Sequence, residues 1–166
     1  MSRGFVKEGD QEEAVIIPPR AVLPPGTINY VTPVGLEALK NEKESLLEER
    51  RKLSQDNENE YRRATTLIDG KIYLLEERLA SARLIIGKEQ PEDEVRFGAR
   101  VKIKKGKHLQ EFRIVGVDEA DVKMKKISFT SPLARAITGK KLNEILEFKL
   151  GNHIEEIQIL EIDYSY

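Results

Sequence analysis

Between Tyr61 and Ile86 the chain reads YRRATTLIDGKIYLLEERLASARLII. Eight residues of this stretch recur at alternating intervals of four and three: Tyr61, Thr65, Ile68, Ile72, Leu75, Leu79, Ala82 and Ile86. This spacing keeps their side chains on one face of an α-helix, and such a face is stable only against a partner helix. The stretch therefore predicts one helix of a coiled coil.

A partner helix is predicted immediately before it. Thr32 followed by Pro33 is typical of a helix N-cap with proline at the first helical position, and helix-forming residues then continue to Leu53. Leu39, Leu46 and Leu53 recur every seven residues, which gives this helix one leucine row. The remaining seam positions include charged residues, so the packing depends on the second helix.

The two helices are separated by the polar stretch SQDNENE, residues 54–60. Within it, Asn57 followed by Glu60 three residues later favours a second N-cap. Residues 33–86 are therefore predicted to form an antiparallel coiled-coil hairpin with an acidic tip.

Residues 1–32 carry four of the seven prolines and an acidic stretch from Glu8 to Glu13. Proline fixes φ and removes backbone donors, so this segment is expected to be an extended or disordered arm. Two apolar groups, Val15 to Ile17 and Ala21 to Leu23, would allow it to dock on a neighbouring surface; a disordered tail is the alternative.

The residue pattern changes from helical to strand-like after Gly87. Residues 87–93, around Pro91, are expected to be a linker, and residues 94–166 are expected to form a small β-rich domain. Alternating or apolar runs predict strands, and a short helix closed by Gly139 interrupts them. The expected strands are 95–104, 110–117, 122–130, 145–150 and 154–164, with the helix at 132–138. Together with the hairpin this makes an α+β protein.

Composition excludes several classes of function. The 166 residues include 28 Lys and Arg against 29 Asp and Glu, so any contact with nucleic acid must be local. There is no cysteine and there are only two histidines, which excludes a disulfide framework, a thiol nucleophile and a thiolate metal site. No apolar run is long enough to span a membrane and the start lacks a secretory segment, so a cytoplasmic protein is expected.

Two charged groups in the β-rich region are candidate sites. Asp118 to Asp121 spells DEAD, but no phosphate-binding glycine loop accompanies it, so it is interpreted as an acidic turn between strands. Clustered cations favour a solvated sheet face, with a nucleic-acid site as the alternative. These cations are Arg100, Lys102, Lys104, Lys105, Lys107, Lys123, Lys125 and Lys126.

The hairpin tip is the strongest candidate site. Asp56, Glu58 and Glu60 lie within five residues, with basic residues on both sides at 50–52 and 62–63. This arrangement would present carboxylates to Mg²⁺ while the cations contact phosphates, and a partner would have to complete the metal site because Mg²⁺ takes further oxygen ligands. A solvated loop is the alternative.

The chain resembles the bacterial Gre transcript-cleavage factors (GreA/GreB). The resemblance covers roughly residues 30–164 and several of its matches follow in the order of the family. They are Tyr30–Leu36, Glu58–Tyr61, Arg96–Ala99, Ile114–Asp121 and Lys126–Lys140.

The resemblance implies a helical hairpin followed by a domain of FKBP-like fold. It implies that this domain docks on the rim of the RNA polymerase secondary channel, while the hairpin enters the channel toward the nascent RNA 3′ end. The tip acids would then help the polymerase's own site to cleave a backtracked transcript with two Mg²⁺ ions. The chain would be a monomeric accessory factor without enzymatic activity or a cofactor of its own, sharing Mg²⁺ with the polymerase.

Position by position, the resemblance assigns Asp56 and Glu58 to the catalytic tip, although Asp56 stands one position nearer to the glutamate than is usual in the family. It assigns Asp121, Ser131 and Pro132 to polymerase docking. Arg62 and Arg63 would face the RNA.

The chain departs from the family in one feature that bears on function. Its first hairpin arm, counted from Gly35 to Asp56, is shorter than the usual family arm by about ten residues, or ~15 Å at the helical rise. A shorter hairpin leaves open a second hypothesis, a non-cleaving secondary-channel regulator like the short-hairpin Rnk relatives. A third, an FKBP-like isomerase or chaperone, requires an aromatic-lined pocket.

Overall fold

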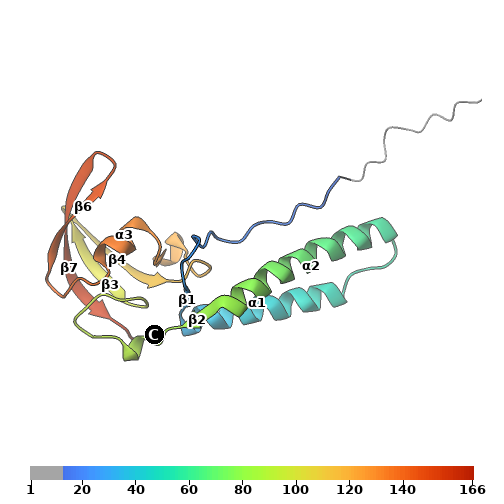
Figure 1. Cartoon of the computed structure of the whole chain (residues 1–166), viewed down its shortest axis with the longest axis horizontal. Coiled ribbons are helices and arrows are strands. Elements are labelled where there is room, and N and C mark those ends of the chain that lie inside the picture. The colour runs from blue at the N-terminus through green and yellow to red at the C-terminus, as the bar shows by residue number, and fades with distance from the viewer. Residues whose placement is uncertain (1–12) are drawn as a thin grey trace, which may run out of the picture.

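In the computed structural model, which describes residues 13–166, a long helical hairpin projects from a curled β-sheet (Figure 1). The hairpin consists of α1 (Pro33–Arg51) and α2 (Glu58–Ser81). The sheet holds five strands in the order β5-β4-β3-β7-β6. The α+β class is therefore confirmed. None of the helices within residues 13–166 has the length and apolar character that crossing a membrane requires.

Both helices begin at the predicted caps. The Thr32 side chain accepts a hydrogen bond from the Gly35 amide at 2.9 Å, and Pro33 follows it at the first helical position. The Asn57 side chain accepts one from the Glu60 amide at 3.1 Å. Each cap satisfies an amide that the helix itself leaves without a partner, which fixes where the helix starts.

The hairpin seam contains the predicted leucine row. Its buried residues are Leu39, Leu46, Ile68 and Leu75, together with Val31 at the base. The charged seam positions of α1 pair with acids on α2: Lys43 lies 2.9 Å from Glu76, and Arg50 lies 2.5 Å from Asp69. The ion pairs flank the apolar row, so charged and apolar positions both join the helices.

The base of the hairpin differs from the prediction. The strand β1 (Asn29–Val31) pairs in parallel with β2 (Ala82–Leu84), and α2 ends at Ser81. The prediction that residues 82–86 continue the helix was wrong, because their backbone groups bond to a strand some fifty residues earlier in the chain. The arm was likewise expected to extend without regular structure to residue 32, but its last residues form this strand.

The sheet is antiparallel except at one edge. It comprises β3 (Arg100–Lys105), β4 (His108–Val115), β5 (Lys126–Ser128), β6 (Ile145–Leu150) and β7 (His153–Asp163), and only the β4–β5 pair is parallel. The segment before β5 is the 3₁₀ turn η2 (Val122–Met124), not the predicted strand. Lys125 takes a left-handed φ of 55°, which interrupts an extended chain at that point. Another 3₁₀ turn, η1 (Gly87–Glu89), follows β2.

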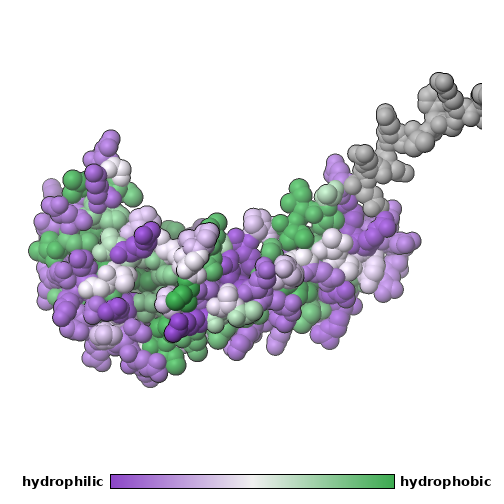
Figure 2. Space-filling model, viewed as in Figure 1, coloured by the Kyte–Doolittle hydropathy of each residue, from purple (hydrophilic) through white to green (hydrophobic). Residues whose placement is uncertain are grey.

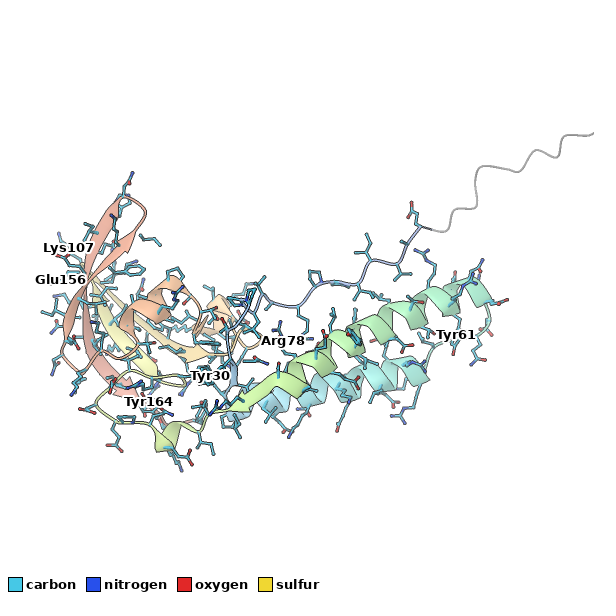
Figure 3. The ribbon with its side chains drawn as sticks, in the orientation of Figure 1. Tyr30, Tyr61, Arg78, Lys107, Glu156 and Tyr164 are labelled. Carbon is cyan, nitrogen blue, oxygen red and sulfur yellow. The ribbon has the colours of Figure 1, made fainter. Side chains whose placement is uncertain are left out.

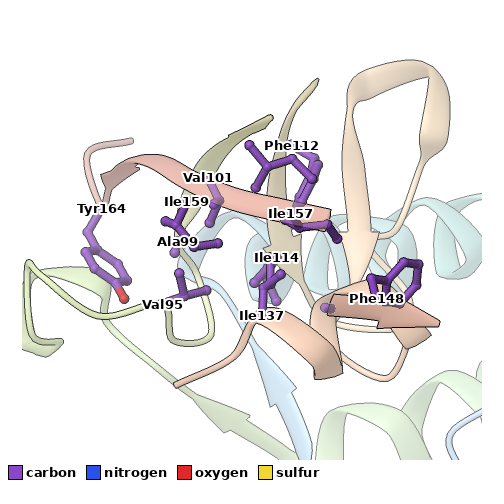
Figure 4. Close-up of a cluster of buried hydrophobic side chains, with 12 residues drawn as sticks. Val95, Ala99, Val101, Phe112, Ile114, Ile137, Phe148, Ile157, Ile159 and Tyr164 are labelled. Carbon is purple, nitrogen blue, oxygen red and sulfur yellow. The ribbon is translucent and has the colours of Figure 1, made fainter. Parts of the chain in front are cut away.

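One face of the sheet packs beneath the helix α3 (Pro132–Ile137). Figure 4 shows the side chains that converge there, among them the fully buried Ile114, Ile137, Ile157 and Ile159. Burying an isoleucine side chain stabilises a fold by about 1.5–3 kcal/mol. The sheet therefore has a core of its own, separate from the hairpin seam. The orientation of the hairpin relative to the sheet depends on the residues that join them.

Candidate functional site

The loop between α1 and α2 holds the first predicted site residue, Asp56. The Ser54 hydroxyl donates a hydrogen bond to the Asp56 carboxylate at 2.7 Å and accepts one from the Asp56 amide at 3.3 Å. Glu58 is the first residue of α2, immediately after the Asn57 cap. Both carboxylates are exposed, at the end of the hairpin farthest from the sheet (Figure 1). The structure thus brings Asp56 and Glu58 together around one helix start.

The helix start also lowers the cost of gathering acids. Glu58 and Glu60 occupy the first turn of α2, where unpaired backbone N–H groups carry partial positive charge. This field stabilises carboxylates at the tip against their mutual repulsion.

The tip offers carboxylate oxygens but not a complete metal site. Within residues 13–166 no group of three or more His, Asp or Glu side chains could hold a metal ion. Mg²⁺ in proteins is often held by one or two carboxylates together with water and substrate oxygens. Asp56 and Glu58 therefore fit the role of ligands that complete a site built by another molecule.

The basic residues at the tip make contacts within the chain. Arg62 donates to the Asn59 side chain at 3.0 Å, and Arg63 donates to the backbone carbonyl of Glu13 at 2.7 Å. Figure 3 shows this end of the hairpin, near the labelled Tyr61. The acceptor of the Arg63 bond is a neutral backbone carbonyl, so this contact is a hydrogen bond and not an ion pair.

The three residues predicted for docking lie around β5. The backbone of Asp121 bonds to Lys126 in both directions, and the Asp121 side chain caps η2. Ser131 caps α3 by accepting from the Ala134 amide at 3.3 Å, and its own amide bonds to Ser128. Pro132 is exposed at the first position of α3. These residues lie at the two ends of one short strand, beside the base of the hairpin, where Phe129 packs against Tyr30.

The acidic turn after β4 has a role that the sequence did not reveal. The Asp118 carboxylate lies 2.9 Å from the Arg78 guanidinium of α2 and 3.0 Å from that of Arg20. Glu119 accepts from the Thr32 hydroxyl at 2.7 Å. The segment is the predicted acidic turn between strands, but both carboxylates are buried in it, with only 8% side-chain exposure. They join the sheet to the hairpin.

An aromatic cluster lies at the same junction. The rings of Tyr30, Phe97 and Phe129 pack with centroids 5.5–5.6 Å apart. Two other phenylalanines, Phe112 and Phe148, are buried in the sheet core. These aromatic side chains are used in packing, whereas an isomerase would require them to line an open pocket.

Three of the clustered cations of the sheet pair with acids on the neighbouring strand. Arg100 donates to Asp163 at 2.6 Å, Lys102 to Glu161 at 3.1 Å, and Lys105 lies 2.9 Å from Glu155. Cross-strand ion pairs of this kind are typical of a solvated sheet face. This part of the structure therefore favours the interpretation as a solvated face over a nucleic-acid site.

Comparison with known proteins agrees with this architecture. Residues 90–164 match the family described as "Transcription elongation factor, GreA/GreB, C-term". The transcription elongation factor GreA of Trichlorobacter lovleyi is 36% identical over 152 residues, which cover 81% of this chain and 96% of the relative. This chain belongs to the GreA/GreB family. The GreA of Flavobacterium psychrophilum is also 36% identical, with 82% of this chain and 97% of the relative covered.

A GreA/GreB factor is a transcription elongation factor, an accessory protein that acts with RNA polymerase. Among solved structures, the GreA factor homologue Gfh1 of Thermus thermophilus matches over 82% of this chain and 99% of its own, at 21% identity and a TM-score of 0.38. Membership of the GreA/GreB family rests on the sequence relatives.

Proposed function

We propose that this GreA/GreB factor docks at the rim of the RNA polymerase secondary channel and stimulates cleavage of backtracked transcripts by the polymerase active site. One observation carries the proposal: Asp56 and Glu58 are exposed at the far end of a rigid hairpin, around the start of α2. Docking would use the surface around β5 that contains Asp121, Ser131 and Pro132. The chain separates these two surfaces by the length of the hairpin.

The chain's own residues would position charge for the reaction. The Ser54 hydroxyl orients the Asp56 carboxylate, and the first turn of α2 stabilises that of Glu58. Together they would supply ligands to a second Mg²⁺ shared with the polymerase, which in two-metal sites activates water and stabilises the leaving oxygen. The polymerase would supply the remaining ligands.

The short hairpin supports a second candidate function, a regulator that occupies the channel without promoting cleavage. α1 has 19 residues and α2 has 24, which correspond to about 28 and 36 Å at 1.5 Å per residue. Coordination of Mg²⁺ requires oxygen at about 2.1 Å, so a deficit of a few ångströms in reach would abolish it.

The decisive experiment adds the protein to a backtracked elongation complex with Mg²⁺ and measures RNA shortening. We expect cleavage with the unmodified protein and its loss with Asp56→Asn or Glu58→Gln, because each variant removes a charged ligand. Glu60→Gln is the matched control, since it neutralises a neighbouring tip acid that is not assigned to the metal.

Binding to the polymerase must be measured in the same samples. Binding without RNA shortening would contradict the cleavage proposal and support the regulator. Equal loss of cleavage in all three variants would indicate a general effect of tip charge and contradict the specific roles of Asp56 and Glu58.

The docking surface needs its own variant. Pro132→Ala changes an exposed residue at the first helical position of α3, where alanine is compatible with the helix. We expect weaker binding to the polymerase at an unchanged melting temperature, and Leu142→Ala, exposed elsewhere on the sheet side, serves as the control. Unchanged binding of Pro132→Ala would remove this residue from the proposed interface.

A further inference from the structure

The segment of residues 13–28, here called the N-terminal arm, runs beside α2 from the tip toward the sheet (Figure 1). The Glu13 carbonyl accepts from Arg63 near the tip, and the Ala21 carbonyl accepts from Arg78 near the base. Eight residues of polyproline-type chain span about 25 Å, and the fifteen helical residues between the two arginines span about 22 Å. The arm is therefore extended along α2, because the distance that its residues can span matches the distance between the two arginines on the helix.

One ridge of the arm faces the hairpin. Ile17, Arg20 and Leu23 are partly buried, whereas Ile16 and Val22, each next to one of them in the chain, are 85% and 80% exposed. A period of three residues is that of a polyproline II helix, which the flanking prolines favour. Figure 2 shows hydrophobic side chains gathered along the side of the hairpin where the arm lies.

Gly70 of α2 provides the space in which the Ile17 side chain of this ridge packs. A Cβ at Gly70 would lie 2.0 Å from Cδ1 and 2.7 Å from Cγ1 of Ile17, so Ile17 occupies the space that any other residue would fill. Glycine inside a helix costs about 0.5–1 kcal/mol relative to alanine. The contact with Ile17 gives a structural reason for a residue that otherwise weakens α2.

Arg20 connects the arm directly to two other parts of the molecule, α1 and the turn after β4. Its Nη1 and Nη2 donate to the Glu42 carboxylate of α1 at 2.7 and 3.0 Å. Its Nε donates to Asp118 of the sheet at 3.0 Å, and Asp118 also pairs with Arg78 of α2. The Arg20 side chain is only 18% exposed, which limits screening by solvent. One guanidinium thus contacts both the hairpin and the sheet.

We propose that the N-terminal arm is a strap that fixes the direction of the hairpin relative to the sheet, with Arg20 as the positioning residue and the Ile17–Gly70 contact as its anchor. The consequence for RNA cleavage rests on the proposed function, because the direction of the hairpin determines where Asp56 and Glu58 are presented. The strap itself is a property of the isolated protein and is tested without polymerase.

The anchor is tested by cleavage with trypsin after Arg20 in the full-length protein, followed by mass spectrometry. We expect Gly70→Ala and Ile17→Ala each to accelerate this cleavage about tenfold, equivalent to ~1.4 kcal/mol in the opening equilibrium. The double variant Ile17→Ala with Gly70→Ala should be slower than Gly70→Ala alone, because the smaller side chain removes the clash. Ile16→Ala is the matched control and should leave the rate unchanged.

Gly70→Ala also distinguishes an effect on the arm from an effect on the stability of α2. Alanine should raise the helicity of α2 while it releases the arm, so faster cleavage cannot be attributed to a weakened helix. Equal cleavage rates in Gly70→Ala and the unmodified protein would overturn the anchor.

The positioning role is tested by the distance between spin labels on the tip and the sheet. Since the chain has no cysteine, Gln55→Cys and Lys149→Cys give a uniquely labelled pair of exposed positions. We expect Arg20→Ala to broaden the distance distribution, Arg20→Lys to broaden it less, and Ile16→Ala to leave it narrow. An unchanged distribution in Arg20→Ala would overturn the positioning role, whatever the outcome of the RNA cleavage experiment.

Discussion

The Thr32 hydroxyl donates a hydrogen bond to the Glu119 carboxylate at 2.7 Å while it accepts one from the Gly35 amide at 2.9 Å. The same oxygen therefore caps α1 and bonds the hairpin to the sheet. Thr32 is fully buried, so neither bond can be replaced by solvent. The start of the hairpin and its attachment are determined by one side chain.

Replacing Thr32 by valine keeps the shape but removes both bonds. We expect a loss of about 2–3 kcal/mol in the free energy of unfolding, since the buried amide and carboxylate lose their partner. Urea denaturation measures this loss. Thr32→Ser retains the hydroxyl and should remain within about 1 kcal/mol of the unmodified protein; a loss as large as that of valine would contradict the role assigned to the hydroxyl.

How far the sequence predicts this fold depends on the range of the interactions. The caps at Thr32 and Asn57 and the seven-residue leucine row are local patterns, and the structure confirms them. The pairing of β1 with β2 joins segments about fifty residues apart, so nothing in residues 82–84 distinguishes them from a continuing helix. The helical periodicity of the sequence therefore continues beyond Ser81, where the pairing of β2 with β1 ends the helix.

The same limit applies to the candidate site. The tip residues Asp56 and Glu58 could be placed because the hairpin is defined by its own periodicity. Asp118 could be assigned to an acidic turn, but its partners could not be predicted, because Arg20 and Arg78 lie 98 and 40 positions away in the chain. Opposite charges in distant segments carry no sequence signal of their pairing, so the junction emerged only from the structure.

Adjacent leucines of α1 should respond differently to truncation. Leu46 is buried in the seam, whereas Leu47 is 40% exposed. We expect Leu46→Ala to lower the free energy of unfolding by about 2–4 kcal/mol and Leu47→Ala by less than about 1 kcal/mol. Urea denaturation of the two variants compares them directly. Similar losses would show that the seam lies on another face of α1.

Gly116 is required by a close backbone approach. A Cβ at this position would lie 2.5 Å from the Tyr30 carbonyl oxygen, which cannot move without β1. We expect Gly116→Ala to lose about 1–3 kcal/mol of stability and to weaken the β1–β2 pairing. Hydrogen exchange at the Ile85 amide, which bonds to the Val31 carbonyl at 3.0 Å, reports that pairing.

A second glycine provides the control for this experiment. Gly106 has a left-handed φ of 58° and open space around its Cβ position. Gly106→Ala should therefore lower stability through backbone strain at the β3–β4 turn but leave exchange at Ile85 unchanged. Faster exchange in both variants would mean that Ile85 reports global unfolding and not the junction.

Asp163 should show an acid-range pH dependence. Hydrogen bonds from the side chain and backbone of Ser165, and from Arg100, lower the pKa of its carboxyl from 3.8 to about 2. Because the folded-state pKa is the lower one, the charged form stabilises the fold above pH 3.8, and this contribution is lost as the pH falls toward 2. NMR titration should find the low pKa, and Ser165→Ala should raise it.

Asp69 gives an internal control in the same titration. Its pKa is lowered chiefly by the hydrogen bond from Arg50, so Ser165→Ala should leave it unchanged and Arg50→Ala should raise it. A pKa of Asp163 that does not respond to Ser165→Ala would assign the shift to the residue-165 backbone amide and Arg100, and not to the hydroxyl.

The length of the hairpin distinguishes the two candidate functions. One heptad inserted into each helix, on the tip side of the Arg50–Asp69 pair, preserves the seam and extends the tip by about 10 Å. If reach limits cleavage, the longer hairpin should cleave backtracked RNA faster and should depend on Asp56 and Glu58 more strongly. If the native length already places the tip at the metal, the insertion should abolish cleavage, because the carboxylates would pass the site. Five-residue insertions are the control, since they lengthen the helices but rotate the seam residues beyond them by about 140° and so turn them away from one another.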